Sequence, residues 1–365
     1  MAGKWRVTGI YAVLHFLVDF CCAFFMFRLM ADDEQFYLIL FWYNFCAFAL
    51  QMPIGLLADK WNRNALAGTL GAVLVALALT LGVFLNTGSG LFLAILAGLG
   101  NCLFHLGGGI ETLNRGKDSL APLGVFVSPG AAGLFLGTLL GKGSFLPWFV
   151  PVALLLIGAA VLLMDAGKGG SLASQNAPLS FREGENNGMF LWAAVLLLFL
   201  VVVLRSYLGM IFAFPWKRTE PGSILYLTAV VGGKIAGGFL ADRIGIKKTA
   251  CISLAASALL FLGADRAIWG GLAVCLFNMS MPITLFLAAR SLSGCKGFAF
   301  GLLTFSIFLG FLPAYFGYQV CTPFTLAVLG AASALLLTAG SFLSDGAGRS
   351  GKQTGQPIMR GEGNG

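Results

Sequence analysis

The stretch GLLADKWNRN (residues 55–64) ends an apolar segment and recurs in the second half of the chain as GFLADRIGIKK (residues 238–248). In both copies an aspartate is followed by basic residues at the end of the second apolar segment of its half. A second pair, CLFHLGGGIE (residues 102–111) and CLFNMSMPIT (residues 275–284), lies in the fourth segment of each half. Two repeated motifs at matching positions indicate a chain built from two related halves, which is an architecture of membrane transporters.

The composition requires a membrane environment. The chain has 365 residues, of which 58% are hydrophobic and 10% charged, and its mean hydropathy is +0.88. A soluble domain of this length could not bury that much apolar surface. The net charge of +8 lies in short loops between apolar runs, so we expect no nucleic-acid partner. All eight cysteines lie in or beside apolar runs, which predicts neither disulfides nor a cysteine metal site.

A helix needs about 20 apolar residues to cross a bilayer. Twelve apolar runs are candidate spans, at approximately residues 7–28, 36–58, 65–86, 89–112, 119–140, 146–165, 189–213, 223–241, 249–264, 267–289, 297–318 and 323–343. The one long polar connection, 166–188, predicts a linker between an N-terminal six-helix bundle (1–165) and a C-terminal one (189–343). The tail, 344–365, is polar and is expected to be disordered. The predicted class is an all-α polytopic membrane protein.

The basic residues predict the orientation. With the N-terminus in the cytoplasm, 16 of the 23 lysines and arginines fall in inner segments and five in outer loops or span ends. Positive charge is retained on the cytoplasmic side of a bilayer. We therefore expect a multi-pass protein of the cell membrane, monomeric, with both termini in the cytoplasm.

The repeated loop resembles a motif of the major facilitator superfamily, G-x-L-x-D-[RK]-x-G-[RK]-[RK]. The second copy (residues 238–248) matches it better, because Asn62 stands in the first copy where the family has glycine. HFLVDF (residues 15–20) and GNCLFHLGGG (residues 100–109) are similar to the fosmidomycin-resistance-type branch. SPGAAG (residues 128–133) partly resembles the G-P-x-x-G-G pattern of exporting antiporters. The resemblance implies the major facilitator fold, with two six-helix bundles that transport by alternating access.

Within the repeated loops, Asp59 and Asp242 are expected to lie beside the start of a neighbouring helix, where the helix dipole favours a carboxylate. Such a contact would hold the cytoplasmic side shut and would break when the halves move. The predicted gating residues are Gly55, Asp59, Lys60, Arg63, Gly238, Asp242 and Arg243.

Ionisable side chains inside spans are costly, at about 2.5–3.5 kcal/mol near the bilayer centre, and normally have a function. His15 and Asp19 share one helix face and could take up and release a proton. Asn101 and His105 repeat this spacing in the fourth span, and the three glycines that follow let backbone approach a partner or ligand. The alternative is neutral hydrogen bonding between packed helices. Glu111 has either a proton or gating role or an interfacial ion pair with Arg115.

The second half carries cations inside its spans. Lys234 precedes Asp242 by eight residues and so lies about 12 Å inside the membrane. The equivalent position in the first half of the chain is Gln51. Arg205, in the seventh span, offers a planar fork suited to carboxylate or phosphate, although both cations could instead snorkel. The predicted substrate-binding residues are Lys234, Arg205, Asn101, Tyr207 and Gln51.

These features predict a secondary transporter of a small anionic or zwitterionic solute, coupled to protons, with efflux favoured over uptake and no cofactor or metal. Two alternatives stay open. One is a membrane-embedded enzyme that uses His15, Asp19 and His105, although the sequence lacks HExxH, a paired aspartate dyad and a Cys/His cluster. The other is a receptor or lipid-handling protein on the same scaffold. The prediction is that the protein is not an enzyme.

Overall fold

The computed structural model describes residues 2–85, 89–143, 146–168 and 188–353, and the regular elements in these ranges are helices. Helices suit a chain in lipid because each satisfies its own backbone hydrogen bonds. The first half contains α1 (Ala2–Phe25), η1 (Met26–Met30), α2 (Phe36–Asn44), η2 (Phe45–Ala49), α3 (Gln51–Trp61), α4 (Asn64–Phe84), α5 (Gly90–Gly116), α6 (Ala121–Val127), α7 (Pro129–Lys142) and α8 (Phe149–Lys168). The second half contains α9 (Gly188–Ile211), η4 (Pro215–Arg218), α10 (Glu220–Ile244), α11 (Ile246–Phe261), α12 (Ala267–Asn278), α13 (Ser280–Ser291), α14 (Lys296–Tyr315) and α15 (Pro323–Gln353).

Each of the twelve predicted spans has a helical counterpart. Within the described ranges, eleven helical segments are long and apolar enough to cross a membrane, whereas α11, with 16 residues, is shorter than the 18 residues required of such a segment. Several spans contain an interruption: η1 and η2 are π-helical turns, the fifth span breaks at Ser128 between α6 and α7, and the tenth breaks at Met279. The prediction of an all-α polytopic membrane protein is confirmed.

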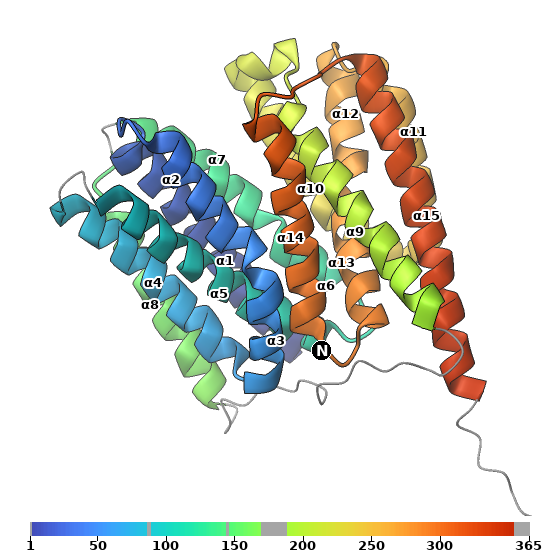
Figure 1. Cartoon of the computed structure of the whole chain (residues 1–365), viewed down its shortest axis with the longest axis horizontal. Helices are drawn as coiled ribbons and strands as arrows, with labels where there is room; N and C mark the ends of the chain where they lie inside the picture. The colour runs from blue at the N-terminus through green and yellow to red at the C-terminus, as the bar shows by residue number, and fades with distance from the viewer. Residues whose placement is uncertain (1, 86–88, 144–145, 169–187, 354–365) are drawn as a thin grey trace, which may run out of the picture.

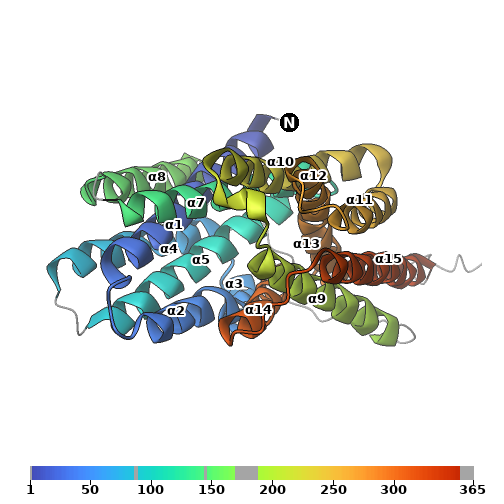
Figure 2. The same ribbon diagram turned by 90° about the horizontal axis from the view of Figure 1, so that it is seen from above.

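The helices form two bundles, with α1–α8 in one and α9–α15 in the other (Figure 1). The bundles contact each other mainly through α3 with α14 and through α6 with α10. A view from above shows α3 beside α14 between the two groups (Figure 2). The fifth span of the first bundle therefore faces the eighth span of the second, and this contact positions the site described below.

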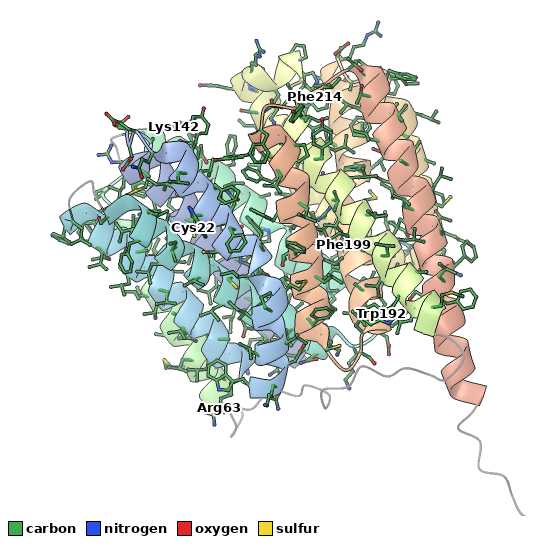
Figure 3. All side chains as sticks on the ribbon, viewed as in Figure 1. Cys22, Arg63, Lys142, Trp192, Phe199 and Phe214 are labelled. Atoms are coloured by element: carbon green, nitrogen blue, oxygen red, sulfur yellow. The ribbon has the colours of Figure 1, made fainter. Side chains whose placement is uncertain are left out.

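The first residues of α1 and the last residues of α15 lie at the same end of the molecule, the lower end in Figure 1. We call this end the N-terminal face. Arg63 lies at this face, whereas Lys142 and Phe214 lie at the opposite face (Figure 3). The two loops that carry the repeated motif, after α3 and after α10, are both at the N-terminal face.

The three consecutive glycines of α5 allow close packing on three sides. The helix runs unbroken through them. A methyl group on Gly107 would collide with α4, one on Gly108 with side chains of α1 and α6, and one on Gly109 with Phe300 of the other bundle. Small residues permit such approaches between membrane helices. The glycines therefore bring α5, which carries His105, against both its own bundle and the opposite one.

Two predicted boundaries differ from the structure. The last helix, α15, continues to Gln353, so residues 344–353 are helical where a disordered tail was expected. Residues 354–365 of that tail lie outside the described residues, as do residues 169–187 of the predicted linker. The linker's remaining residues belong to the ends of α8 and α9.

Candidate functional site

Three ionisable side chains from two helices meet inside the first bundle. The Nε2 atoms of His15 on α1 and His105 on α5 are 2.9 Å apart. The Asp19 carboxylate, one turn from His15, places Oδ2 at 3.2 Å from His15 Nε2 and Oδ1 at 3.7 Å from His105 Nε2. We call His15, Asp19 and His105 the triad. Both imidazole side chains are nearly buried, whereas the Asp19 side chain is 21% exposed, so solvent reaches the carboxylate edge of the triad.

Asn101 belongs to the triad's surroundings rather than to the second bundle. Its Nδ2 donates to Asp19 Oδ1 at 3.2 Å and also contacts the Tyr43 hydroxyl at 3.3 Å and the Cys22 sulfur at 3.7 Å. Its backbone oxygen accepts a hydrogen bond from His105 Nδ1 at 2.9 Å. Asn101, predicted as a substrate contact, is thus placed where it orients both Asp19 and His105.

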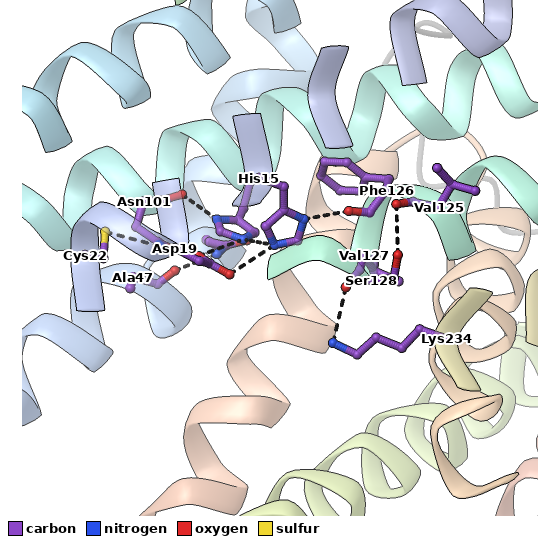
Figure 4. Close-up of polar contacts among 12 residues, drawn as sticks. His15, Asp19, Cys22, Ala47, Asn101, Val125, Phe126, Val127, Ser128 and Lys234 are labelled. Carbon is purple, nitrogen blue, oxygen red and sulfur yellow. Dashed lines mark hydrogen bonds and ion pairs between the residues drawn. The ribbon is translucent and has the colours of Figure 1, made fainter. Parts of the chain in front are cut away.

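A broken helix links the triad to the second bundle. Pro129 has no N–H and cannot donate to Val125, so the helix stops at Val127 and restarts at Pro129. The Phe126 oxygen then accepts from His15 Nδ1 at 2.7 Å, and the next oxygen, that of Val127, accepts from Lys234 Nζ at 3.2 Å (Figure 4). The Ser128 hydroxyl donates to the Val125 oxygen at 3.2 Å. In a continuous helix the carbonyl groups of Val125, Phe126 and Val127 would accept hydrogen bonds from backbone N–H groups. Here each of them accepts a hydrogen bond from a side chain instead.

The intramembrane cations of the second bundle are partly buried and lack carboxylate partners. In the part of the chain that the structure describes, neither Lys234 nor Arg205 forms an ion pair, and Arg205 Nε is buried with no hydrogen-bond partner. Lys234 lies within electrostatic range of both Arg205 and Asp19. A buried charge without a partner is costly. These two cations are therefore groups whose charge an anion could compensate.

The remaining predicted substrate residues lie elsewhere. Tyr207 donates to the Tyr318 oxygen at 3.2 Å, in a contact exposed to solvent. Gln51 is completely buried where α3 packs against α14, and its Nε2 donates to the Ala47 oxygen at 2.5 Å. The structure brings neither of them into contact with Lys234. Their proposed role in substrate binding stays a prediction.

Glu111 is placed apart from the triad. Its carboxylate accepts a hydrogen bond from Arg115 Nε at 2.6 Å and one from Asn64 Nδ2 at 3.2 Å. Of the two interpretations drawn from the sequence, the ion pair with Arg115 is the one that the geometry matches. The carboxylate joins the end of α5 to the start of α4 at the N-terminal face.

Each aspartate of the repeated motif caps a helix of the opposite bundle. Asp59, at the end of α3, accepts from the backbone N–H groups of Gly297 at 2.7 Å and Phe298 at 3.0 Å, at the start of α14. Gly55 lies in contact with Gly297, with no room for a side chain between them. Cys295, two residues before Gly297, is buried here, and burial raises the pKa of its thiol to about 11.

Asp242 makes the equivalent contact in the other direction. At the end of α10 it accepts from Leu120 N at 2.7 Å, Ala121 N at 3.0 Å and the Ser119 hydroxyl at 2.7 Å, at the start of α6. Gly238 allows this approach, because a methyl group there would lie 2.7 Å from the Leu120 oxygen. Beside Asp242 is a pocket of about 500 Å³ open at the N-terminal face. The basic gating candidates Lys60, Arg63 and Arg243 are exposed.

The triad is also the place where a metal ion could be held. Its three ligand atoms lie within 4.8 Å of one another. However, two nitrogen ligands around a tetrahedral ion with bonds of about 2.0 Å are separated by about 3.3 Å. The Nε2–Nε2 distance of 2.9 Å is shorter and is that of a hydrogen bond. The arrangement therefore matches a proton better than a metal ion.

Reasoning from sequence missed the backbone contribution to the site. The oxygens of Phe126 and Val127 could not be singled out, because every residue has one. The available signal was the Pro129–Gly130 pair inside a span, which predicts a kink. Gly130 itself lies against both His15 Nε2 and Asp19 Oδ2, so a side chain at this position would enter the triad.

Comparison with known proteins bears on the fold. No family model and no curated protein matches the sequence. Among solved structures, the chain is similar to a variant of the E. coli fucose:proton symporter FucP, with a TM-score of 0.66 and 14% identity over 92% of this chain and 98% of that one. It is also similar to the human organic anion transporter MFSD10 (TETRAN), with a TM-score of 0.66 and 16% identity over 92% of this chain and 99% of that one.

The chain has the major facilitator fold. Its two helical bundles are therefore arranged as in a fold already known from solved structures.

Proposed function

We propose that the protein is a proton-coupled secondary transporter of a small anionic or zwitterionic solute. The observation that carries this proposal is the shared broken helix, where the triad and Lys234 bind neighbouring carbonyl groups. A proton site in one bundle and a cationic site in the other are joined by one interrupted helix. Alternating access requires such a link, because each ligand must alter the equilibrium between states that the other also alters.

The substrate class follows from the charges at the interface between the bundles. Lys234 and Arg205 provide two positive charges, and the one carboxylate within range, Asp19, is engaged by two histidines and Asn101. Arginine binds carboxylate or phosphate through a planar pair of donors. A solute with at least one such group would compensate both cations.

Gating is assigned to the two aspartate caps. Asp59 and Asp242 each hold the N-terminal end of a helix across the bundle interface, and both caps lie at the N-terminal face. With this face in the cytoplasm, as the distribution of lysine and arginine predicts, both caps would have to release before the cytoplasmic side opens. The partial exporter pattern around Pro129 favours efflux.

The test begins with substrate discovery, by thermal-shift screening of the purified protein against carboxylates, phosphates and phosphonates. Hits are then followed in proteoliposomes with an imposed pH gradient. We expect Asp19→Asn to abolish accumulation driven by the gradient but to retain exchange of labelled for unlabelled solute. The matched control is Asp165→Asn, which removes a carboxylate paired with Arg6 away from the triad. Full gradient-driven accumulation in Asp19→Asn would refute the assignment of coupling to the triad.

A further inference from the structure

The tautomers of both histidines follow from their backbone contacts. His15 Nδ1 lies 2.7 Å from the Phe126 oxygen, and His105 Nδ1 lies 2.9 Å from the Asn101 oxygen. A carbonyl oxygen can only accept a hydrogen bond, so each Nδ1 must carry a hydrogen. In a neutral imidazole the other nitrogen, Nε2, is then a bare acceptor.

Two bare acceptors cannot form the contact that is observed. The Nε2 atoms are 2.9 Å apart, and the two rings meet edge to face, at an interplanar angle of 88°. Without a hydrogen between them, two nitrogen lone pairs would repel at this distance. One additional proton on either ring converts the contact into an N–H···N hydrogen bond and gives the pair a single positive charge.

Placing that proton on Asp19 does not resolve the conflict. A protonated carboxyl could donate to His15 or to His105, and the two Nε2 atoms would still face each other without a donor. An ionised Asp19 instead lies against both rings, accepts from Asn101 and balances the charge of the pair. The other titratable groups around the triad are Cys22 on α1, Tyr43 on α2 and Lys234 on α10.

We infer that the His15–His105 pair binds a single proton, shared between the two Nε2 atoms, and that Asp19 remains ionised as its counter-ion. This inference rests on the proposed proton coupling and specifies its site and stoichiometry. Release of the proton leaves two facing lone pairs, so the rings must separate. Because His15 is held by Phe126 at the helix break, the separation acts directly on the element that also holds Lys234.

The composition of the chain makes the test selective. The protein contains two histidines, and both are in the pair. Protein labelled with ¹⁵N in the histidine rings, and purified without a polyhistidine tag, therefore gives NMR signals from this site alone. We expect both Nδ1 atoms to be protonated, a scalar coupling between the two Nε2 atoms, and one joint loss of the Nε2 proton as the pH is raised over the range in which the protein stays folded.

A variant separates the roles of the groups without requiring transport. In Asp19→Asn the counter-ion is lost, so the joint step should persist and move to lower pH. If Asp19 were the proton acceptor, the wild type would show no Nε2 protonation over this range, and that result would overturn the inference. Two independent steps, one for each ring, would overturn it as well, and so would loss of the step in Asp19→Asn protein that retains the wild-type unfolding temperature.

The outcomes are distinguishable from failure of the proposed function. Transport driven by a pH gradient, in a protein whose rings never carry an Nε2 proton, overturns this inference and leaves the proposed function standing. A shared proton on the pair, in a protein whose transport ignores the pH gradient, overturns the proposed function and supports the proton site itself.

Discussion

His15 and Lys234, from opposite bundles, bind consecutive carbonyl groups of one broken helix. The His15 ring donates to the oxygen of Phe126, and the Lys234 ammonium group donates to that of Val127. The two residues are 219 positions apart in the sequence and lie on α1 and α10. The two side chains are therefore connected through neighbouring peptide groups of one helix (Figure 4).

The break itself should be required for coupling. Pro129→Ala restores an N–H at position 129 and allows α6 to continue into α7, so the freed carbonyls return to intrahelical hydrogen bonds. We expect the variant to lose most of a coupling free energy on the order of 1–3 kcal/mol between proton and substrate. The measurement is the pH dependence of the substrate Kd. The control is Pro122→Ala in the first turn of α6, where no N–H is needed, and an unchanged pH dependence in Pro129→Ala would contradict the link.

Gly130 should tolerate no side chain. A methyl group there would collide with His15 Nε2 and Asp19 Oδ2, so we expect Gly130→Ala to destabilise the protein by about 1–3 kcal/mol through overpacking and to abolish coupling. The matched control, Gly9→Ala in α1, meets no atom within 4 Å and should be neutral or slightly stabilising. Thermal unfolding and gradient-driven uptake measure the two effects. Wild-type uptake by Gly130→Ala would show that the triad geometry is not needed.

Lys234 should contribute to substrate affinity. Removing the ammonium group in Lys234→Ala takes away a charged donor, which is worth about 1.5–3 kcal/mol, so we expect the substrate Kd to rise about 10- to 150-fold. Lys248→Ala removes an exposed lysine and is the control. Binding is measured by isothermal titration calorimetry with a solute from the thermal-shift screen. The same Kd in both variants would remove Lys234 from the binding site.

The Asp59 cap should control access to Cys295. In the closed state this thiol is buried and its pKa is raised to about 11, so it carries little thiolate at pH 8. Asp59→Asn weakens the cap by about 1 kcal/mol, which opens the contact more often. It also removes a negative charge that helps to raise the pKa of this thiol, so both effects bring the thiol closer to its ordinary pKa of about 8.5. We expect alkylation at pH 8 to be several-fold faster.

Mass spectrometry of the peptide that contains Cys295 measures this rate separately from the other cysteines. In the wild type the rate should keep rising with pH up to about 11, because more thiolate forms as the pH approaches its pKa. The control is Asp118→Asn, which removes an exposed carboxylate that lines the pocket beside Asp242. A labelling rate in Asp59→Asn equal to that of the control would exclude the cap from gating.

Much of the fold could be predicted from the sequence, because hydropathy is a local property. Runs of about 20 apolar residues must become helices in lipid, and the recurrence of the Ala-Asp motif places the two halves in register. The i, i+4 spacing of His15 and Asp19 also predicts their shared helix face. The boundary of α15 was less predictable, since polar residues 344–353 extend an apolar helix beyond its membrane-spanning part.

The sequence by itself determined which ionisable residues lie inside the spans, where they are costly to bury: His15, Asp19, His105, Lys234 and Arg205. Only the tertiary structure decided their partners. In the structure His105 contacts His15, Asn101 contacts Asp19 of the triad, and Glu111 pairs with Arg115. The backbone oxygens of Phe126 and Val127 accept from His15 and Lys234. The physical reason is that a span's composition reports the cost of burying a group, whereas its partner depends on contacts between helices far apart in the chain.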